Sequence, residues 1–278
     1  MSKKNHPPES AKQKNEGSRE NLLPKQLFGI IRENGIEELN RPAKALIFSS
    51  FTAGIIISFS FVFKAIFKAY LPDAEWSFLI ESMGYTVGFI LVILGHMQLF
   101  TENTITTVVP LLSHFNYKNL CKVTRLWSIV FLFNIIGTAV AAIFILNNQL
   151  FDSNVVRELD AIAAHVSEAD AVQNIIRGIP AGILITSLVW VLPVVSNRLL
   201  VIFFVTYLMA IGGFSHVIVG SAESAYWFFK GQIDLFDYFF VFLLPTAFGN
   251  ILGGTVIFTL LIYGQVNEEI ASDHKHSK

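Results

Sequence analysis

Charged residues are scarce in this chain, because Asp, Glu, Lys and Arg make up only 15% of its 278 residues. Hydrophobic residues make up 53%, with 26 phenylalanines among them, and the mean hydropathy is +0.55. These polar residues are too few to cover the surface of an ordinary soluble globular protein. The apolar composition also excludes a disordered chain. The formal net charge of −1 gives no basic field, so nucleic acid is not an expected partner.

Cysteine pairs, a leader segment and metal motifs are also missing. The single Cys121 cannot form an intramolecular disulfide, and the first 40 residues contain no apolar stretch, so we expect no cleavable signal peptide. The residues His96, Glu102, His216 and Glu223 lack the HExxH spacing of a zinc site. We therefore expect no metal and no cofactor.

Uncharged stretches long enough to cross a membrane occur six times. A helix needs roughly 20 apolar residues to cross about 30 Å of hydrocarbon, and none of the six shows the polar stripe of a helix in a soluble core. The sequence therefore predicts an all-α membrane protein. Its six transmembrane helices are expected over residues 45–63, 82–101 with an apolar continuation to 112, 126–146, 178–197, 199–222 and 238–265.

The segments outside the six-span pore domain (45–265) are polar. Residues 1–24 predict a disordered cytoplasmic tail and residues 266–278 a loose cytoplasmic tail. Between residues 25 and 44, apolar residues fall near helical spacing among charged neighbours, which predicts an amphipathic juxtamembrane helix. These apolar residues are Leu27, Phe28, Ile31 and Leu39. The helix either lies on the membrane surface or simply leads into the first span.

The distribution of Lys and Arg predicts which side of the membrane holds the termini. When successive loops are assigned to alternate sides, the side with both termini carries 15 of the 20 Lys and Arg residues. The other side keeps an acidic set of residues and only five cations, Lys64, Lys68, Arg157, Arg177 and Lys230. The positive-inside rule therefore places both termini in the cytoplasm, in a cytoplasmic (inner) membrane.

Two pairs of similar segments indicate an internal repeat. Residues 53–58 (AGIIIS) in the first span resemble residues 181–186 (AGILIT) in the fourth, and residues 134–137 (NIIG) in the third resemble residues 250–253 (NILG) in the sixth. Both pairs keep the same order, so spans one to three and four to six form two copies. Because each copy has an odd number of crossings, we expect two inverted three-helix repeats.

The second and fifth spans are then counterparts, and both have interrupted centres. The second contains residues 95–104 (GHMQLFTENT), and the fifth contains residues 212–216 (GGFSH). Gly weakens a helix by about 1 kcal/mol relative to Ala, and unpaired backbone groups cost several kcal/mol in hydrocarbon. We therefore expect both helices to be broken, with close helix packing as the alternative role of the glycines. Glu223, near the outer end of the fifth span, is expected at a solvated helix end.

These features resemble the formate/nitrite transporter family. Residues 99–101 (LFT), 213–216 (GFSH) and 249–254 (GNILGG) carry the resemblance, which covers about residues 25–265. It implies an aquaporin-like six-helix protomer, a homopentamer and one pore through each protomer. It also implies a channel or transporter for small monovalent anions or their acids, such as formate or nitrite, and not an enzyme.

The resemblance implies a central pair of pore residues. His216 matches the family's pore histidine, and Thr101 matches the threonine that faces it. The residues Tyr85, Phe89 and Met209 match the apolar constrictions on either side. A histidine at this depth can pass a proton to a weak-acid anion, which then crosses the constrictions as a neutral species. The alternative is a histidine that only packs.

Further residues of the same motifs are candidates for the pathway. Phe100 and Phe214 belong to the matched segments of the two breaks and are counted as pore residues. His96, Glu102 and Asn250 are possible vestibule residues. His96 either lines the vestibule or pairs with Glu102.

Several positions depart from the family pattern and indicate an outlying subgroup. Gly220 stands in place of an Asn four residues after the central His, Gly182 replaces an Asn of the fourth span, and Glu102 replaces a small residue. No Lys occurs between Lys122 and Lys230, so the family's outer lysine is missing. Three residues are possible substitutes for it: Arg157, His165 and Arg177.

Two other functions remain open. The missing lysine and Glu102 give some support to an aquaporin-like pore for a small neutral solute. An intramembrane hydrolase would need Ser215 and His216 to act together, but adjacent side chains diverge on a helix and the chain has no G-x-S-x-G elbow. Anion flux, measured against glycerol and water flux, separates an anion pore from a pore for a neutral solute.

Overall fold

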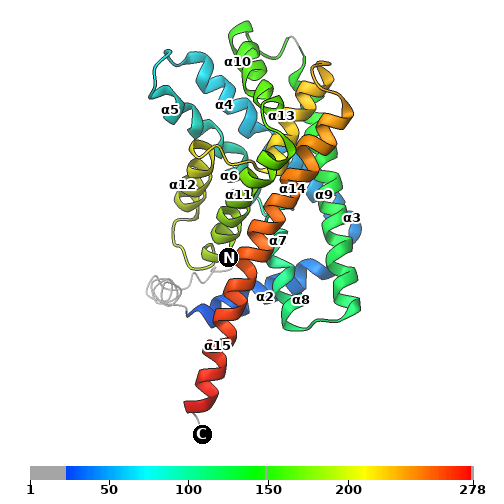
Figure 1. Cartoon of the computed structure of the whole chain (residues 1–278), viewed down its shortest axis with the longest axis vertical. Coiled ribbons are helices and arrows are strands. Elements are labelled where there is room, and N and C mark those ends of the chain that lie inside the picture. The colour runs from blue at the N-terminus through cyan, green and yellow to red at the C-terminus, as the bar shows by residue number, and fades with distance from the viewer. Residues whose placement is uncertain (1–22, 148, 277–278) are drawn as a thin grey trace, which may run out of the picture.

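Every regular element that the structure describes is helical. The structure is a computed structural model that describes residues 23–147 and 149–276, so the tail predicted over residues 1–24 lies almost wholly outside the described residues. Five helices are long and apolar enough to cross a membrane, and the shorter apolar helix α12 (Arg198–Ile211) supplies part of a sixth crossing. The predicted six-span all-α fold is confirmed (Figure 1).

Four crossings are continuous. In chain order they are the first (α3, Ala43–Ile57, and α4, Phe59–Tyr70), the third (α9, Tyr117–Ile145), the fourth (α11, Ala171–Val191) and the sixth (η2, Asp237–Leu243; α14, Leu244–Ile251; η3, Leu252–Thr259; α15, Leu260–His276). In Figure 1, α9 lies at one edge of the bundle with α3 against it, and α11 lies beside α14 in the middle. The elements η2 and η3 are π-helical. Between the third and fourth crossings lie α10 (Ser153–Ala164) and the short 3₁₀ turn η1 (His165–Ser167).

The second and fifth crossings are broken, as the sequence predicts. The first half of the second crossing consists of α5 (Ser77–Gly84) and α6 (Thr86–Leu94), and its second half of α7 (Asn103–Thr106) and α8 (Val108–Ser113). Residues 95–102 between these halves are unwound. In the fifth crossing, residues 212–216 separate α12 from α13 (Val217–Phe229).

The two breaks have the same backbone conformation. His96 has a positive φ of 51° and Gly213 a positive φ of 62° at equivalent points after the first half-helix. The N–H groups that follow them, of Met97 and Phe214, both donate five residues back. A positive φ is free of strain for glycine but uncommon for other residues. The two repeats therefore share one backbone geometry at their breaks. His96 occupies a position in this geometry that is better suited to glycine.

Close helix crossings in the first half depend on two glycines. Gly54 on α3 and Gly137 on α9 lie at the crossing of these helices. A Cβ on Gly54 would collide with the carbonyl oxygen of Asn134, and a Cβ on Gly137 with that of Phe51. Because glycine has no side chain, the two backbones can touch. Membrane helices commonly pack in this way, since lipid supplies no hydrophobic driving force for their association.

The same contact recurs in the second half. Gly182 on α11 lies against the carbonyl oxygen of Asn250, and Gly253 lies against that of Ile179. Gly182, Asn250 and Gly253 fall in the segments whose sequences match those of the first half, and Ile179 lies two residues before the first of these segments. The prediction of two inverted three-helix repeats is therefore confirmed by packing as well as by pattern.

The predicted amphipathic helix is α2 (Pro24–Asn40), and its apolar face is buried inside the protein. Leu27, Phe28 and Ile31 pack into a cluster with residues of α7, α8, α11 and α15. Gly35 lies against the backbone at Thr106. The helix is therefore docked on the bundle through its apolar face.

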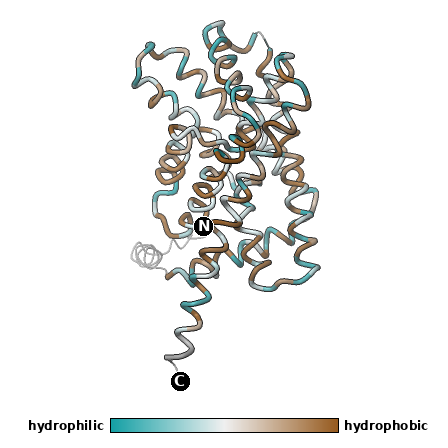
Figure 2. Tube along the Cα trace, viewed as in Figure 1, coloured by the Kyte–Doolittle hydropathy of each residue, from teal (hydrophilic) through white to brown (hydrophobic). Residues whose placement is uncertain are grey.

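The last helix is longer than the sequence predicts. α15 runs to His276, so most of the segment 266–278, which the sequence assigns to a loose tail, continues the sixth crossing. Figure 1 shows this helix projecting from the end of the bundle that also holds α2 and α8. In Figure 2, hydrophobic residues predominate through the middle of the bundle and hydrophilic ones are more frequent toward its ends.

The repeat contact leads to a stability prediction. Gly182→Ala places a Cβ against the carbonyl oxygen of Asn250, and we expect it to lower the free energy of unfolding by about 1–3 kcal/mol, as overpacking does. Gly264→Ala on exposed α15 is the matched control, because no atom lies near its added Cβ. Thermal unfolding of the purified protein in detergent measures both. Equal unfolding temperatures for the two variants would contradict the packing argument.

Candidate functional site

The first unwound segment is held by a buried asparagine. Asn134, on α9, accepts a hydrogen bond from the N–H of Phe100 through Oδ1 at 2.9 Å. Its Nδ2 donates to the carbonyl oxygens of Ser50 at 2.8 Å and Gln98 at 2.9 Å. Asn134 is wholly buried, so its amide replaces helical hydrogen bonds that the break removes and that no solvent supplies at this depth.

The second unwound segment is held in the same way. Asn250, on α14, accepts from the N–H of Val217 at 3.0 Å and donates to the carbonyl oxygens of Gly178 at 2.8 Å and Ser215 at 2.9 Å. Asn134 thus binds the residues on both sides of Leu99, and Asn250 binds those on both sides of His216. Leu99 and His216 are therefore equivalent positions of the two repeats, and only one of them is ionisable.

The contact between the two breaks is made by His216 and Thr101. His216 Nε2 lies 2.8 Å from Thr101 Oγ1, and both residues are buried. His216 also caps α13, since its Nδ1 accepts from the N–H of Val219 at 3.3 Å. A neutral ring that accepts at Nδ1 carries its proton on Nε2, so that atom donates to the threonine hydroxyl.

Aromatic rings pack against the central histidine. The Phe89 ring meets His216 edge to face, with centroids 4.9 Å apart, and Tyr85 lies beyond Phe89 at 5.5 Å. Phe89 and Met209 are wholly buried. The side of the imidazole that meets Phe89 is therefore packed against buried, apolar surface.

Phe100 lies in a different environment from these rings. Its ring packs edge to face against Phe131 at 4.8 Å and against Trp127 at 5.6 Å. It does not belong to the lining of either large cavity described below. The structure therefore places Phe100 in the packing between the break and α9.

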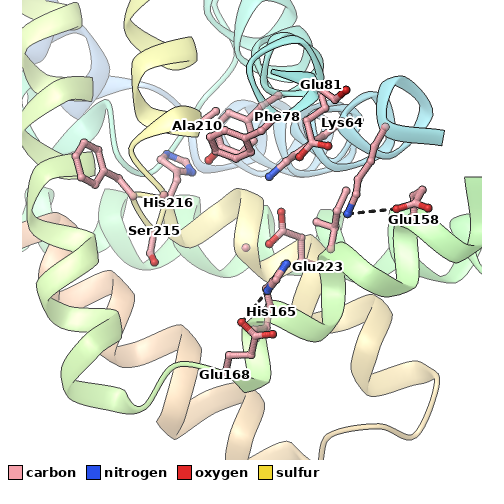
Figure 3. Close-up of a pocket in the computed structure, with 18 of the residues that line it drawn as sticks. Lys64, Phe78, Glu81, Glu158, His165, Glu168, Ala210, Ser215, His216 and Glu223 are labelled. Atoms are coloured by element: carbon pink, nitrogen blue, oxygen red, sulfur yellow. Dashed lines mark hydrogen bonds and ion pairs between the residues drawn. The ribbon is translucent and has the colours of Figure 1, made fainter. Parts of the chain in front are cut away.

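Two large cavities approach the His216–Thr101 pair. The first, the α10-side cavity, has a volume of about 820 Å³ and is lined by residues of α4, α5, α10, α11 and α13, together with His216, Tyr85 and Phe214 (Figure 3). The second, the α2-side cavity, has a volume of about 610 Å³ and is lined by residues of α2, α6, α11 and α12 and of the second-span break. The fully buried Phe89, Leu99 and Met209 line neither cavity.

The predicted vestibule residues lie in different places. His96 and Glu102 line the α2-side cavity, and no hydrogen bond or ion pair joins them in the described part of the chain. Asn250 lies in neither cavity lining and is wholly buried as the support of the second break. Glu223 lines the α10-side cavity and is only partly exposed, so the expectation of a solvated helix end is wrong.

Two of the unusual glycines have a packing explanation. Gly182 contacts the backbone of Asn250, and a Cβ on Gly220 would meet the ring of Phe242. The cations proposed as substitutes for a missing lysine line the α10-side cavity together: Arg157, His165 and Arg177. Arg157 is bound to Glu158 at 3.0 Å and His165 to Glu168 at 2.7 Å.

Sequence reasoning missed Asn134 as a residue of the site. The signal was present, because Asn134 and Asn250 begin the two matching segments that indicated the repeat. A buried amide beside a broken helix is a natural partner for its unpaired backbone. No group of three or more His, Cys, Asp or Glu residues suited to a metal occurs among the residues described.

Comparison with known proteins decides the family. The profile described as formate/nitrite transporter matches residues 25–264. The chain belongs to this family. It is 38% identical over 265 residues to the inner membrane protein YfdC of Escherichia coli (strain K12), covering 92% of this chain and 84% of that protein.

Solved structures of formate/nitrite transporter proteins share the fold. One titled as a pentameric formate channel with formate bound has a TM-score of 0.67 and 19% identity, covering 80% of this chain and 96% of that one. An FNT family ion channel has a TM-score of 0.75 and 17% identity, covering 86% of this chain and 98% of that one. The chain is a membrane transport protein with an aquaporin-like fold and is not an enzyme.

The support of the breaks is testable by mutation. Asn250→Ala leaves the buried N–H of Val217 without its partner, and we expect the free energy of unfolding to fall by about 1–3 kcal/mol. Asn134→Ala should have a similar effect, because it makes the equivalent bonds. Asn154→Ala, at an exposed site on α10, is the control. If thermal unfolding in detergent shows all three variants alike, the amides do not hold the breaks.

Proposed function

We propose that the chain is a channel or proton-coupled transporter for small monovalent anions of weak acids, of the formate and nitrite class. The observation that carries the proposal is the contact of 2.8 Å between His216 and Thr101, where the two broken helices meet between two cavities. An ionisable side chain at such depth in a membrane protein is usually functional. The known formate channel of the same fold supports the substrate class.

The proposed path runs from one cavity to the other past His216. A hydrated anion is excluded by the buried Phe89 and Met209, because removal of its water costs far more than for a neutral molecule. Protonated His216 gives its proton to the anion, and the neutral acid passes the apolar rings. The N-terminus of α13, which His216 caps, offers partial positive charge to the anion before transfer.

We also propose the setting in which the pore works. The excess of Lys and Arg near the termini places α2 and α15 on the cytoplasmic face, so that the α2-side cavity opens inward. The relative named as an inner membrane protein supports a cytoplasmic (inner) membrane. The pentameric channel of the same fold supports a homopentamer. We propose that each protomer of this homopentamer holds one pore and that lipid surrounds the assembly.

A pore for a small neutral solute is the second candidate. The observation that favours it is Glu102, whose carboxylate lines the α2-side cavity and has one buried oxygen with no hydrogen-bond partner among the described residues. A bare carboxylate there repels anions. Proteoliposomes that pass glycerol or water but no formate or nitrite would favour this candidate.

The role of the histidine is testable by formate and nitrite uptake. His216→Asn should lower uptake into proteoliposomes at acid pH by about 100-fold and flatten its pH dependence, because it removes the proton donor. Thr101→Val should lower uptake less, because it removes only the partner of Nε2.

The control for these variants is His114→Asn, at an exposed site after α8. All the variants should keep the size-exclusion profile of the wild-type protein. An unchanged pH profile in His216→Asn would contradict the proposed proton transfer.

A further inference from the structure

Each cavity contains a carboxylate on the approach to the central pair. In the α2-side cavity it is Glu102, the residue directly after Thr101. Its Oε1 is buried and has no hydrogen-bond partner among the described residues. An ionised oxygen left in this state is costly, whereas a proton or a bound donor would satisfy it.

The charges around Glu102 are mostly negative. The α2 helix presents Glu37 and Glu38 to the same cavity, the second-span break presents His96, and the start of α12 presents Arg198. Glu38 is occupied by bonds from Gln98 Nε2 at 2.8 Å and Arg41 Nη1 at 3.1 Å. No described cation pairs with Glu102, so the approach to Thr101 from this side is acidic.

The α10-side cavity contains the counterpart, Glu223. It lies two turns after His216 on α13, so the two side chains share one helix face with Gly220 between them. Figure 3 shows Glu223 and His216 around the same open space. Gly220 has no side chain, and the ring of Phe242 from η2 occupies the place where one would project.

Many charged groups line the cavity that contains Glu223, and five of them are paired with one another. Lys68 binds Glu158 at 3.2 Å, Arg157 binds Glu158, and His165 binds Glu168. Lys64 lines the same cavity as Glu223 (Figure 3). The remaining charged or titratable residues of this lining are Asp73, Glu81, Tyr85 and Arg177.

We propose that Glu102 and Glu223 couple the entry of an anion to the entry of a proton. Each carboxylate repels an anion from the central pair while it is ionised. Once protonated, it is neutral and offers a hydrogen-bond donor to the same anion. The two residues thus act as specificity-determining groups that admit the anion only together with a proton, and this role rests on the function proposed above.

The coupled entry of anion and proton conserves protons. A proton from the solution in one cavity binds the carboxylate, and the anion enters beside it. The proton then passes to the anion, directly or through His216, and the O–H bond of the carboxyl group breaks as that of the neutral acid forms. The acid crosses and releases its proton to water on the other side, so one proton moves with one anion and no net charge crosses.

The test uses membrane vesicles of both orientations that contain the full chain, with formate as the probe. Glu102→Gln imitates the protonated carboxyl group. It should raise formate flux at neutral pH by roughly tenfold when formate enters from the α2 side, and should flatten the dependence on the pH of that side. Glu223→Gln should do the same for entry from the α10 side only.

The matched controls carry the same substitution outside both cavity linings. Glu33→Gln changes an exposed residue of α2, and Glu75→Gln changes an exposed residue just before α5. Both should leave the flux and its pH dependence unchanged. Glu102→Asp and Glu223→Asp keep the acid and should keep a wild-type pH dependence, which separates loss of the acid from damage to the fold.

The outcomes distinguish this inference from the proposed function. If wild-type vesicles carry formate but Glu102→Gln and Glu223→Gln behave like the controls, the coupling role is overturned and the anion pathway stands. If these variants lose flux from both sides while the Asp variants keep it, the carboxylates bind substrate, and the role as a filter is overturned. If neither the wild-type protein nor any variant carries formate or nitrite, the proposed function itself fails.

Discussion

Backbone that is unwound inside a membrane must find hydrogen-bond partners within the protein, and the rest of this structure depends on how that demand is met. Two buried asparagines, Asn134 and Asn250, each bind one N–H and one C=O of a break and one carbonyl of a neighbouring helix. Because their amides satisfy the unpaired backbone groups, a broken helix is tolerated at a depth where hydrocarbon offers no hydrogen-bond partner. The glycine crossings bring the asparagine-bearing helices close enough for these bonds.

The ionisable centre of the protein lies at a position where the two repeats carry different residues. The supports and glycine contacts are nearly the same in both halves, but the position between the two supported groups is Leu99 in one half and His216 in the other. One repeat therefore supplies a titratable ring, and the other supplies Thr101, whose hydroxyl meets that ring at 2.8 Å. Two repeats of similar backbone thus hold an asymmetric pair, His216 and Thr101. The cavity on each side of this pair contains a carboxylate, Glu102 or Glu223.

Much of this could be predicted from the sequence, because hydropathy and short repeats depend on local composition. The six crossings, both breaks, the inverted repeat and the family were predictable in this way. The docking of α2, the extension of α15 and the position of Glu223 in a cavity were not, since they depend on contacts between segments far apart in the chain. Asn250 was noticed for its motif, but only packing reveals that it supports backbone instead of lining a vestibule.

The central claim is that the breaks meet at one constriction between two separate cavities, and thiol accessibility tests it most directly. In a Cys121→Ser background, Thr106→Cys and Ser215→Cys each place one thiol in the lining of the α2-side and the α10-side cavity. A membrane-impermeant thiol reagent should label the first only from the face that holds α2 and the second only from the opposite face. Labelling of both thiols from the same face would contradict the account.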